Sequence, residues 1–378
     1  MTLQIASIRL LTVILWLLAL ANPALAHKAS DSFMYLDTNS GHFRIDVALR
    51  DLALLVPLDT NRDGEVTGGE VRQHRGSILN AIEAGITLSA GNSACELRGQ
   101  QWGISEHSDG AYVATRYQVL CDSGQAPERL EYHLLFEQDS LHRGLIQIST
   151  GGEASLAVAG PDSQTVDLRP ASQAGLWHSF ATFLQEGVVH LLIGLDHILF
   201  LLVLVLPASL ARNRAATAAR RWLPNRSQVL ELTAVVTAFT VAHSITLALA
   251  ALKIVSLPIA WVETVIAASI AVAAVNVVWP VLGRKTWPLA FGFGLIHGFG
   301  FASVLSDLTS GTANLAVALA GFNVGVELGQ LALLAICFPL LTLLAQATPL
   351  YRRALVPLTL LGVIGVSLMW VWERVPAI

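Results

Sequence analysis

The chain has 378 residues, of which 54% are hydrophobic and 13% are charged, and its formal net charge at pH 7 is −4. This balance is too apolar for a soluble globular protein, and it lacks the basic excess that nucleic-acid binding requires. Three cysteines are too few for a disulfide-rich scaffold or a cysteine-based zinc module. Polar sequence fills residues 27–170 and apolar runs fill the remainder, so we expect two parts.

Residues 1–26 have the pattern of a secretory signal peptide. Arg9 supplies the positive charge, residues 10–20 form an apolar core, and residues 22–26 end in a small-residue cleavage pattern. An uncleaved first transmembrane helix is the alternative. With cleavage, the mature chain begins at His27 in an oxidising compartment.

Residues 27–168 are expected to form an exported, mainly-β domain. Several short segments alternate apolar and polar residues and are separated by turn-forming residues, which favours a sandwich-like arrangement of strands. Cys95 and Cys121 lie in or beside two candidate strands, and thiols in an exported domain commonly pair, so we predict a disulfide between them. The candidate strands are residues 33–36, 43–49, 112–120, 130–136 and 145–149.

Residues 59–70 interrupt the strand pattern and match the calcium-binding loop of an EF-hand. Oxygen-bearing side chains occupy the first, third and fifth positions, Gly64 allows the sharp turn, and a glutamate closes the loop at the twelfth position. No second loop of this kind occurs in the sequence, so a structural calcium is favoured over a calcium switch; a loop that keeps its fold without metal is the alternative. The predicted calcium ligands are Asp59, Asn61, Asp63, the backbone carbonyl of Glu65, Thr67 and Glu70.

Residues 169–186 have the pattern of an amphipathic linker, and residues 187–378 are expected to form an all-α, six-helix transmembrane bundle. Each apolar run is close to the ~20 residues that a helix needs to cross a bilayer. Lysine and arginine concentrate after the first, third and fifth runs, which predicts cytoplasmic loops there. The N-terminal domain and the C-terminus then face the periplasmic side of a bacterial inner membrane. The six runs lie near residues 187–206, 229–251, 258–281, 287–306, 313–345 and 354–372.

Ionisable side chains within these apolar runs are the main functional signal. Such a group costs several kcal/mol in hydrocarbon unless it has a partner or a function. On one continuous first helix, His190 and His197 share a stripe with Gly194 between them, while Asp196 points toward a neighbouring helix. Polar residues that only join helices by hydrogen bonds are the alternative. The candidate metal-site residues are His190, Asp196, His197, His243, Glu263, His297, Asn323 and Glu327.

The types of ligand narrow the choice of ion. Neutral imidazole together with carboxylate suits nickel, cobalt, zinc or iron(II), whereas copper(I) prefers thiolate and thioether. Histidine also titrates near neutral pH, so the same residues can relay protons. We therefore predict a divalent transition metal in the membrane part and calcium in the exported part.

Four motifs resemble one family. The run His190-x-x-x-Gly194-x-Asp196-His197 is similar to the first-helix signature of the HupE/UreJ family, and residues 242–247, 296–302 and 323–330 resemble its branch with an exported N-terminal domain. The resemblance implies a multi-helix permease associated with nickel or cobalt supply.

Three functions are consistent with these observations. The first is a permease in which the metal is captured near His190 and passes along the other candidate residues toward Glu327. The second is an intramembrane zinc-dependent hydrolase. The third is a calcium-stabilised membrane receptor or assembly factor. The expected partners are the lipid bilayer and the metal ion, without nucleic acid, and a homo-oligomer is left open.

Overall fold

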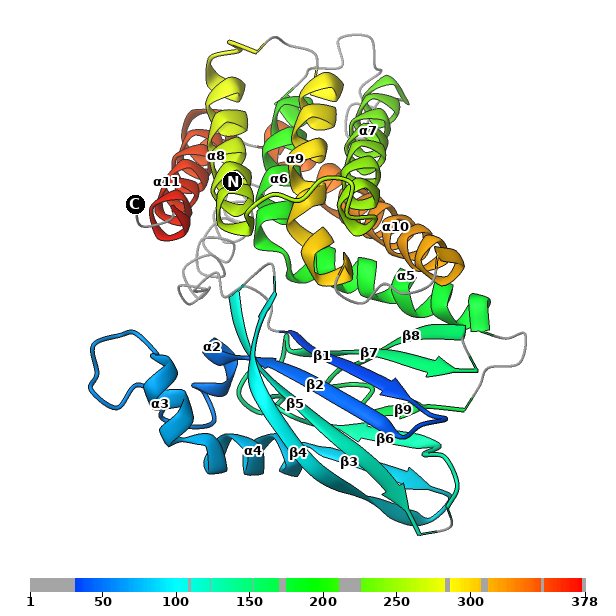
Figure 1. Cartoon of the computed structure of the whole chain (residues 1–378). Helices are drawn as coiled ribbons and strands as arrows, with labels where there is room; N and C mark the ends of the chain where they lie inside the picture. Colours follow the sequence, from blue (N-terminus) through cyan, green and yellow to red (C-terminus); the bar gives the residue numbers. More distant parts are fainter. Residues whose placement is uncertain are drawn as a thin grey trace. The chain divides into compact units, whose positions relative to one another are not determined.

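In the computed structural model of the chain, the nine strands belong to one compact unit and most of the helices belong to a second (Figure 1). The predicted signal peptide, His27 and the arginine-rich segment 211–225 lie outside the residues that the structure describes. The described residues are 31–107, 110–122, 124–151, 153–169, 175–210, 226–282, 286–306, 312–347 and 350–375.

The nine strands of the described residues join edge to edge in the order β8-β7-β1-β2-β5-β4-β3-β6-β9. The prediction of a sandwich-like domain is corrected here, because one continuous sheet curls instead of two sheets packing face to face (Figure 1). The strands are β1 (Asp31–Asp37), β2 (His42–Ala48), β3 (Ile86–Ala90), β4 (Ser93–His107), β5 (Gly110–Cys121), β6 (Arg129–Tyr132), β7 (Arg143–Thr150), β8 (Glu153–Ala159) and β9 (Thr165–Asp167).

The turn between β1 and β2 illustrates how local chemistry builds the sheet. Asp37 Oδ1 accepts hydrogen bonds from the backbone N–H groups of Asn39 and Ser40, at 2.9 and 3.1 Å. Gly41 then adopts a φ of +69°, a left-handed conformation that glycine reaches without steric cost. The turn places β1 and β2 antiparallel, and β1 pairs on its other side with β7 in parallel.

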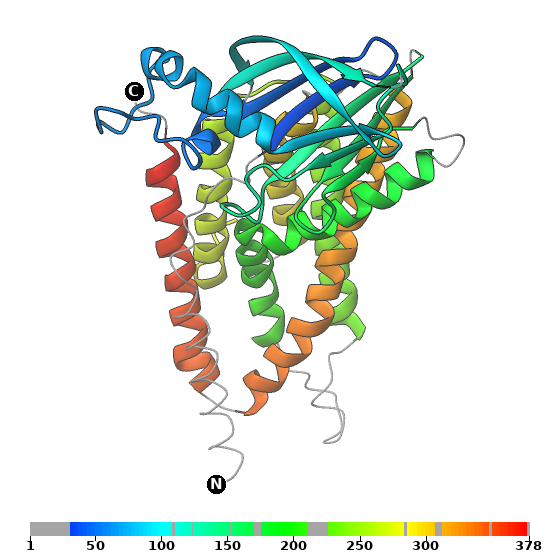
Figure 2. The ribbon, with the colours of Figure 1, turned by 90° about the horizontal axis from the view of Figure 1, so that it is seen from below.

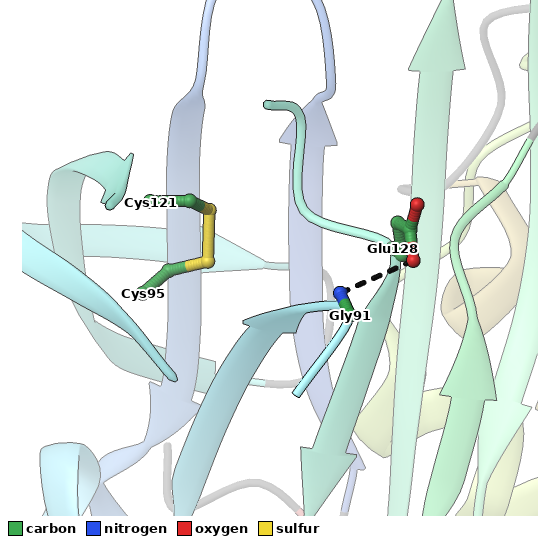
Figure 3. The surroundings of a disulfide bond; sticks show 4 residues. All are labelled: Gly91, Cys95, Cys121 and Glu128. Carbon is green, nitrogen blue, oxygen red and sulfur yellow. Dashed lines mark hydrogen bonds between the residues drawn. A yellow bond between two sulfur atoms is a disulfide. The ribbon is translucent and has the colours of Figure 1, made fainter. Parts of the chain in front are cut away.

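The predicted disulfide is confirmed: Cys95 on β4 and Cys121 on β5 are bonded and directly paired across the two strands (Figure 3). The same view contains a hydrogen bond between the Gly91 backbone N–H and Glu128 Oε2, at 3.2 Å. The covalent bond joins two residues that are 26 positions apart in the sequence.

Three short helices precede β3. They are α2 (Leu49–Leu52), α3 (Gly68–Gln73) and α4 (Arg75–Ala84). Thr67 caps α3, because its side chain accepts from the Glu70 backbone N–H while Glu70 accepts from the Thr67 backbone. Ile78 and Ile82 of α4 are buried in the apolar core of the sheet.

The second unit is helical. Among the described residues, four helices are long and apolar enough to cross a membrane, and the bent pair α5–α6 makes a fifth span if it counts as one. The predicted count of six spans stays a prediction. The helices are α5 (Gly175–Ile193), α6 (Leu195–Leu210), α7 (Arg226–Ala251), α8 (Ile259–Val278), α9 (Thr286–Ser306), α10 (Thr312–Ala347) and α11 (Val356–Arg374), with a π-helical turn at Tyr351–Leu355 before α11.

The first predicted span is not one continuous helix. It breaks at Gly194, where α5 and α6 meet at a bend of 71°, so that the two helices run in clearly different directions in Figures 1 and 2. A Cβ atom at Gly194 would lie 2.9 Å from the His190 carbonyl oxygen and 3.1 Å from Asp196 Oδ1, so a larger residue does not fit the bend. With 16 residues, α6 is about 24 Å long, which is shorter than the hydrocarbon core of a bilayer.

Candidate metal-binding site

Four imidazole rings from four helices converge at the break between α5 and α6. His197 at the start of α6 is central: its ring centroid lies 5.0 Å from that of His190 on α5 and 5.4 Å from that of His297 on α9. The ring of His243 on α7 lies 6.3 Å from that of His197. The structure therefore brings together all four histidines that the membrane sequence singled out.

Glycines allow α7 and α9 to approach closely at this level. A Cβ atom on Gly294 would lie 2.9 Å from the Ala242 side chain and would overlap the Phe239 carbonyl. One on Gly298 would overlap the Thr246 hydroxyl and the His243 carbonyl. Close helix packing through small residues is common in membranes, and here it places His243 and His297 in the same layer.

Asp196 orients the central imidazole. Its Oδ1 accepts hydrogen bonds from the His197 backbone N–H at 2.8 Å and from His197 Nδ1 at 2.9 Å. The expectation that Asp196 points toward a neighbouring helix is therefore wrong for this oxygen, since its hydrogen bonds go to the next residue in the first turn of its own helix. A negative charge is favourable at a helix N-terminus, and the break at Gly194 creates that terminus inside the bundle.

The other two inner imidazoles are held in the same way. His243 Nδ1 lies 3.2 Å from Asn323 Oδ1 on α10, and His297 Nδ1 lies 2.9 Å from the Phe293 carbonyl oxygen. A carbonyl oxygen only accepts, so Nδ1 carries the proton in each ring and Nε2 presents its lone pair. Hydrogen-bonded partners of this kind fix the tautomer and orientation of metal-binding histidines.

Nε2 of His197, of His243 and of His297 is buried without a hydrogen-bond partner in the described part of the chain. The three side chains belong to residues that are 5%, 0% and 2% exposed. Leaving a buried polar atom unsatisfied costs about 1–3 kcal/mol, so three together in one layer require an explanation. Each is an unpaired nitrogen on an oriented ring, which is the chemistry of a nitrogen ligand.

Two of the three ring spacings around His197 are of the right order for a shared ion, and the third, 6.3 Å to His243, is wider. A metal–nitrogen distance of about 2.1 Å places the centroids of imidazoles around one ion roughly 5–6 Å apart. Within the described ranges, however, no group of three or more His, Cys, Asp or Glu side chains is arranged so that it could hold a metal ion. Binding one ion through the three Nε2 atoms therefore requires the rings to move.

Beyond the layer of histidines, two further side-chain hydrogen bonds join α7 to α10. Thr237 donates to Glu327 Oε1 at 2.8 Å, and Thr240 donates to Gln330 Oε1 at 3.1 Å. Glu327 thus lies one helical turn beyond Asn323 on α10. Glu263 is half-buried on α8.

Hydrogen bonds within the predicted calcium-binding loop, residues 59–70, hold it in a defined conformation. Asp59 Oδ1 accepts from the Arg62 N–H at 2.7 Å and its Oδ2 from the Gly64 N–H at 2.9 Å. Gly64 has a φ of +87°, as the sharp turn at this position requires. Hydrogen bonds, first from the Thr67 backbone and hydroxyl and then from the Thr60 backbone, lower the pKa of Glu70 to about 2.

The fold and the imidazole layer define the class of this chain: it is a helical membrane protein with a buried histidine cluster on several helices. Residues 168–374 match the family described as HupE / UreJ protein, and the chain belongs to that family. Membership implies a membrane protein of the nickel or cobalt transporter type. No curated protein matches the chain.

Proposed function

We propose that the protein is a permease for a divalent transition metal and that His197, His243 and His297 form its binding site within the membrane. The single observation that carries the proposal is the set of three buried Nε2 atoms without partners, each on a ring whose Nδ1 is held by an acceptor. This donor set favours nickel, cobalt, zinc or iron(II) as the transported ion.

His190 is suited to be the first ligand that the metal meets. Its ring lies beside that of His197, on the other side of the break at Gly194. Beyond the three inner histidines, Asn323 and Glu327 extend the polar surface along α10. Glu263 on α8 is a further candidate from the sequence.

The orientation in the membrane follows from charge in the sequence. Arginine and lysine are concentrated between α6 and α7 and just before α9, so the positive-inside rule assigns this end of the bundle to the cytoplasm. In this orientation the β domain is periplasmic and metal moves from His190 toward the end of α6. The membrane is then the inner membrane of a bacterium.

Calcium is the second ligand that we propose, at the loop formed by residues 59–70. The observation that favours it is the ordered set of side-chain oxygens from Asp59, Asn61 and Asp63, each turned back toward the loop backbone by hydrogen bonds. Glu70 stands at the end of the loop with both carboxylate oxygens engaged by N–H groups. A calcium ion here stabilises the exported domain.

Metal binding and uptake by the full-length protein test the permease proposal. Purified protein should bind nickel, cobalt or zinc, and vesicles that contain it should accumulate the same ion. Protein that binds no divalent ion and gives no uptake above empty vesicles contradicts the proposal. Metal binding without uptake, together with hydrolysis of a lipid or a peptide, supports the intramembrane hydrolase instead.

A further inference from the structure

Next to the histidines, on the side toward the C-terminal end of α6, lies a layer of three phenylalanine rings. Phe200, Phe239 and Phe293 each stand one helical turn from a site histidine on the same helix: His197 on α6, His243 on α7 and His297 on α9. The Phe200 ring centroid lies 5.3 Å from that of Phe239 and 5.4 Å from that of Phe293. The rings of Phe200 and Phe239 lie 5.4 and 5.3 Å from that of His297.

A cavity of about 430 Å³ begins on the other side of this phenylalanine layer. It lies among α6, α8 and α9, and Phe293 is one of its lining residues. Leu289, one turn before Phe293 on α9, lines it as well. Leu289, Phe293 and His297 therefore follow one another on one face of α9, from the cavity through the phenylalanine layer to the histidines.

We propose that Phe293 is the gate between the histidine site and this cavity, and that the cavity is the vestibule from which the metal leaves. The proposal rests on the function proposed above for the cargo. An apolar constriction prevents a charged ion from crossing until it widens, because the ion finds no water or ligand within it.

Burial indicates which of the three rings moves. Phe200 and Phe239 are 2% and 1% exposed and are enclosed by neighbouring side chains, so a rotation has no free space to enter. Phe293 is partly exposed and borders the cavity, so its ring can rotate into that space. Its backbone carbonyl holds His297 Nδ1, so the side chain can move while the imidazole stays oriented.

Cysteine accessibility in the full chain tests the gate without measuring transport. In a Cys337→Ser background, Leu289→Cys reports on the cavity and His297→Cys on the layer beyond the phenylalanines. Inside-out vesicles receive a charged, membrane-impermeant methanethiosulfonate. We expect Leu289→Cys to react and His297→Cys to react slowly while Phe293 is present.

Adding Phe293→Ala should raise the rate at His297→Cys by about tenfold or more, because a thiol behind a closed gate reacts only through the open minority of molecules. Phe293→Leu should give a smaller increase, and Phe291→Ala, a change to a neighbouring phenylalanine of α9, should give none. His243→Cys is a second reporter if the cysteine at position 297 prevents folding.

Three results overturn the proposal: an unreactive Leu289→Cys, a His297→Cys that reacts equally fast with Phe293 present, or one that stays unreactive in both Phe293 variants. The transport assay is independent of these results. If the cysteines show the expected accessibility but the protein transports no metal, the proposal of a gate stands and the proposal of a metal cargo is wrong.

Discussion

His197 and His297 lie on different helices with their ring centroids 5.4 Å apart, and Nε2 of each is buried without a hydrogen-bond partner. If both nitrogens bind the same ion, His197→Ala and His297→Ala should each abolish most metal uptake. The double variant should be little worse than either single variant, since residues of one site act as a unit. Uptake of radioactive nickel, cobalt or zinc, normalised to folded protein, measures this.

Thr342→Val is the matched control for these variants. Thr342 is also buried in the bundle, but its hydroxyl donates to the Phe338 carbonyl of its own helix. Its replacement should leave uptake close to that of the parent. Parent-level uptake of each metal by both alanine variants would contradict the shared site.

Asn323 should affect metal affinity by orienting the His243 ring that would bind the metal. Its Oδ1 holds Nδ1 of His243, so Asn323→Leu frees the ring to rotate and to change tautomer. Loss of such a supporting partner typically reduces metal affinity by about 10–100-fold. Equilibrium binding to purified protein measures the change, and an affinity equal to the parent's would show that Asn323 does not orient the site.

Glu70→Ala should abolish calcium binding by the exported domain, because it removes the ligand that closes an EF-hand loop bidentately. Calorimetry of residues 27–168 measures the heat of binding. Glu65→Gln is the control: it removes one negative charge from the same loop but keeps the backbone carbonyl that serves as the ligand. No calcium heat from the parent domain at millimolar calcium would refute the site.

Loss of the disulfide should destabilise the β domain. Replacing Cys95 and Cys121 by alanine removes a constraint on the unfolded chain, which for a separation of 26 residues is worth about 3.5 kcal/mol of unfolding free energy. Urea denaturation of the domain measures it. A reductant should lower the stability of the parent domain and leave the double variant unchanged; equal midpoints for the two proteins would contradict the expectation.

Acid should weaken the β domain through His142. Burial lowers the pKa of His142 to about 3, where its Nε2 lies within hydrogen-bonding distance of Ser32 Oγ and the Tyr132 hydroxyl. The unfolded chain takes up the proton near pH 6.5 and the folded chain does not. The free energy of unfolding should therefore fall as the pH is lowered from about 6.5 toward about 3.

Urea midpoints of His142→Gln and of His42→Gln, measured at several pH values, isolate this contribution. The first variant should lose part of the pH dependence over that interval. His42 is exposed, so its replacement should keep the parent's slope. An unchanged slope in His142→Gln would assign the acid sensitivity to other groups, among them Glu70, whose lowered pKa removes stability only as the pH falls from about 4.5 toward about 2.

The sequence alone determined which chemistry the chain contains and roughly where. Strong alternation marked the strands around Phe33, Phe43, Tyr112 and Leu145, because a sheet with one buried face repeats every two residues. It did not mark β4, whose polar residues obscure that repeat over 15 residues. The thiol pair was predictable because Cys95 and Cys121 belong to an expected exported domain, where two thiols commonly pair.

Only the tertiary structure decided how the membrane residues meet. The break at Gly194 places Asp196 in the first turn of a new helix, bonded to His197, and sets His197 against histidines from α7 and α9. Thr237 was not singled out by its sequence context, and neither was the phenylalanine layer, because a phenylalanine in an apolar helix has the same local pattern whether it fills a core or closes a path. Sequence periodicity indicates which face of one helix is polar; the contacts between helices depend on packing among segments far apart in the chain.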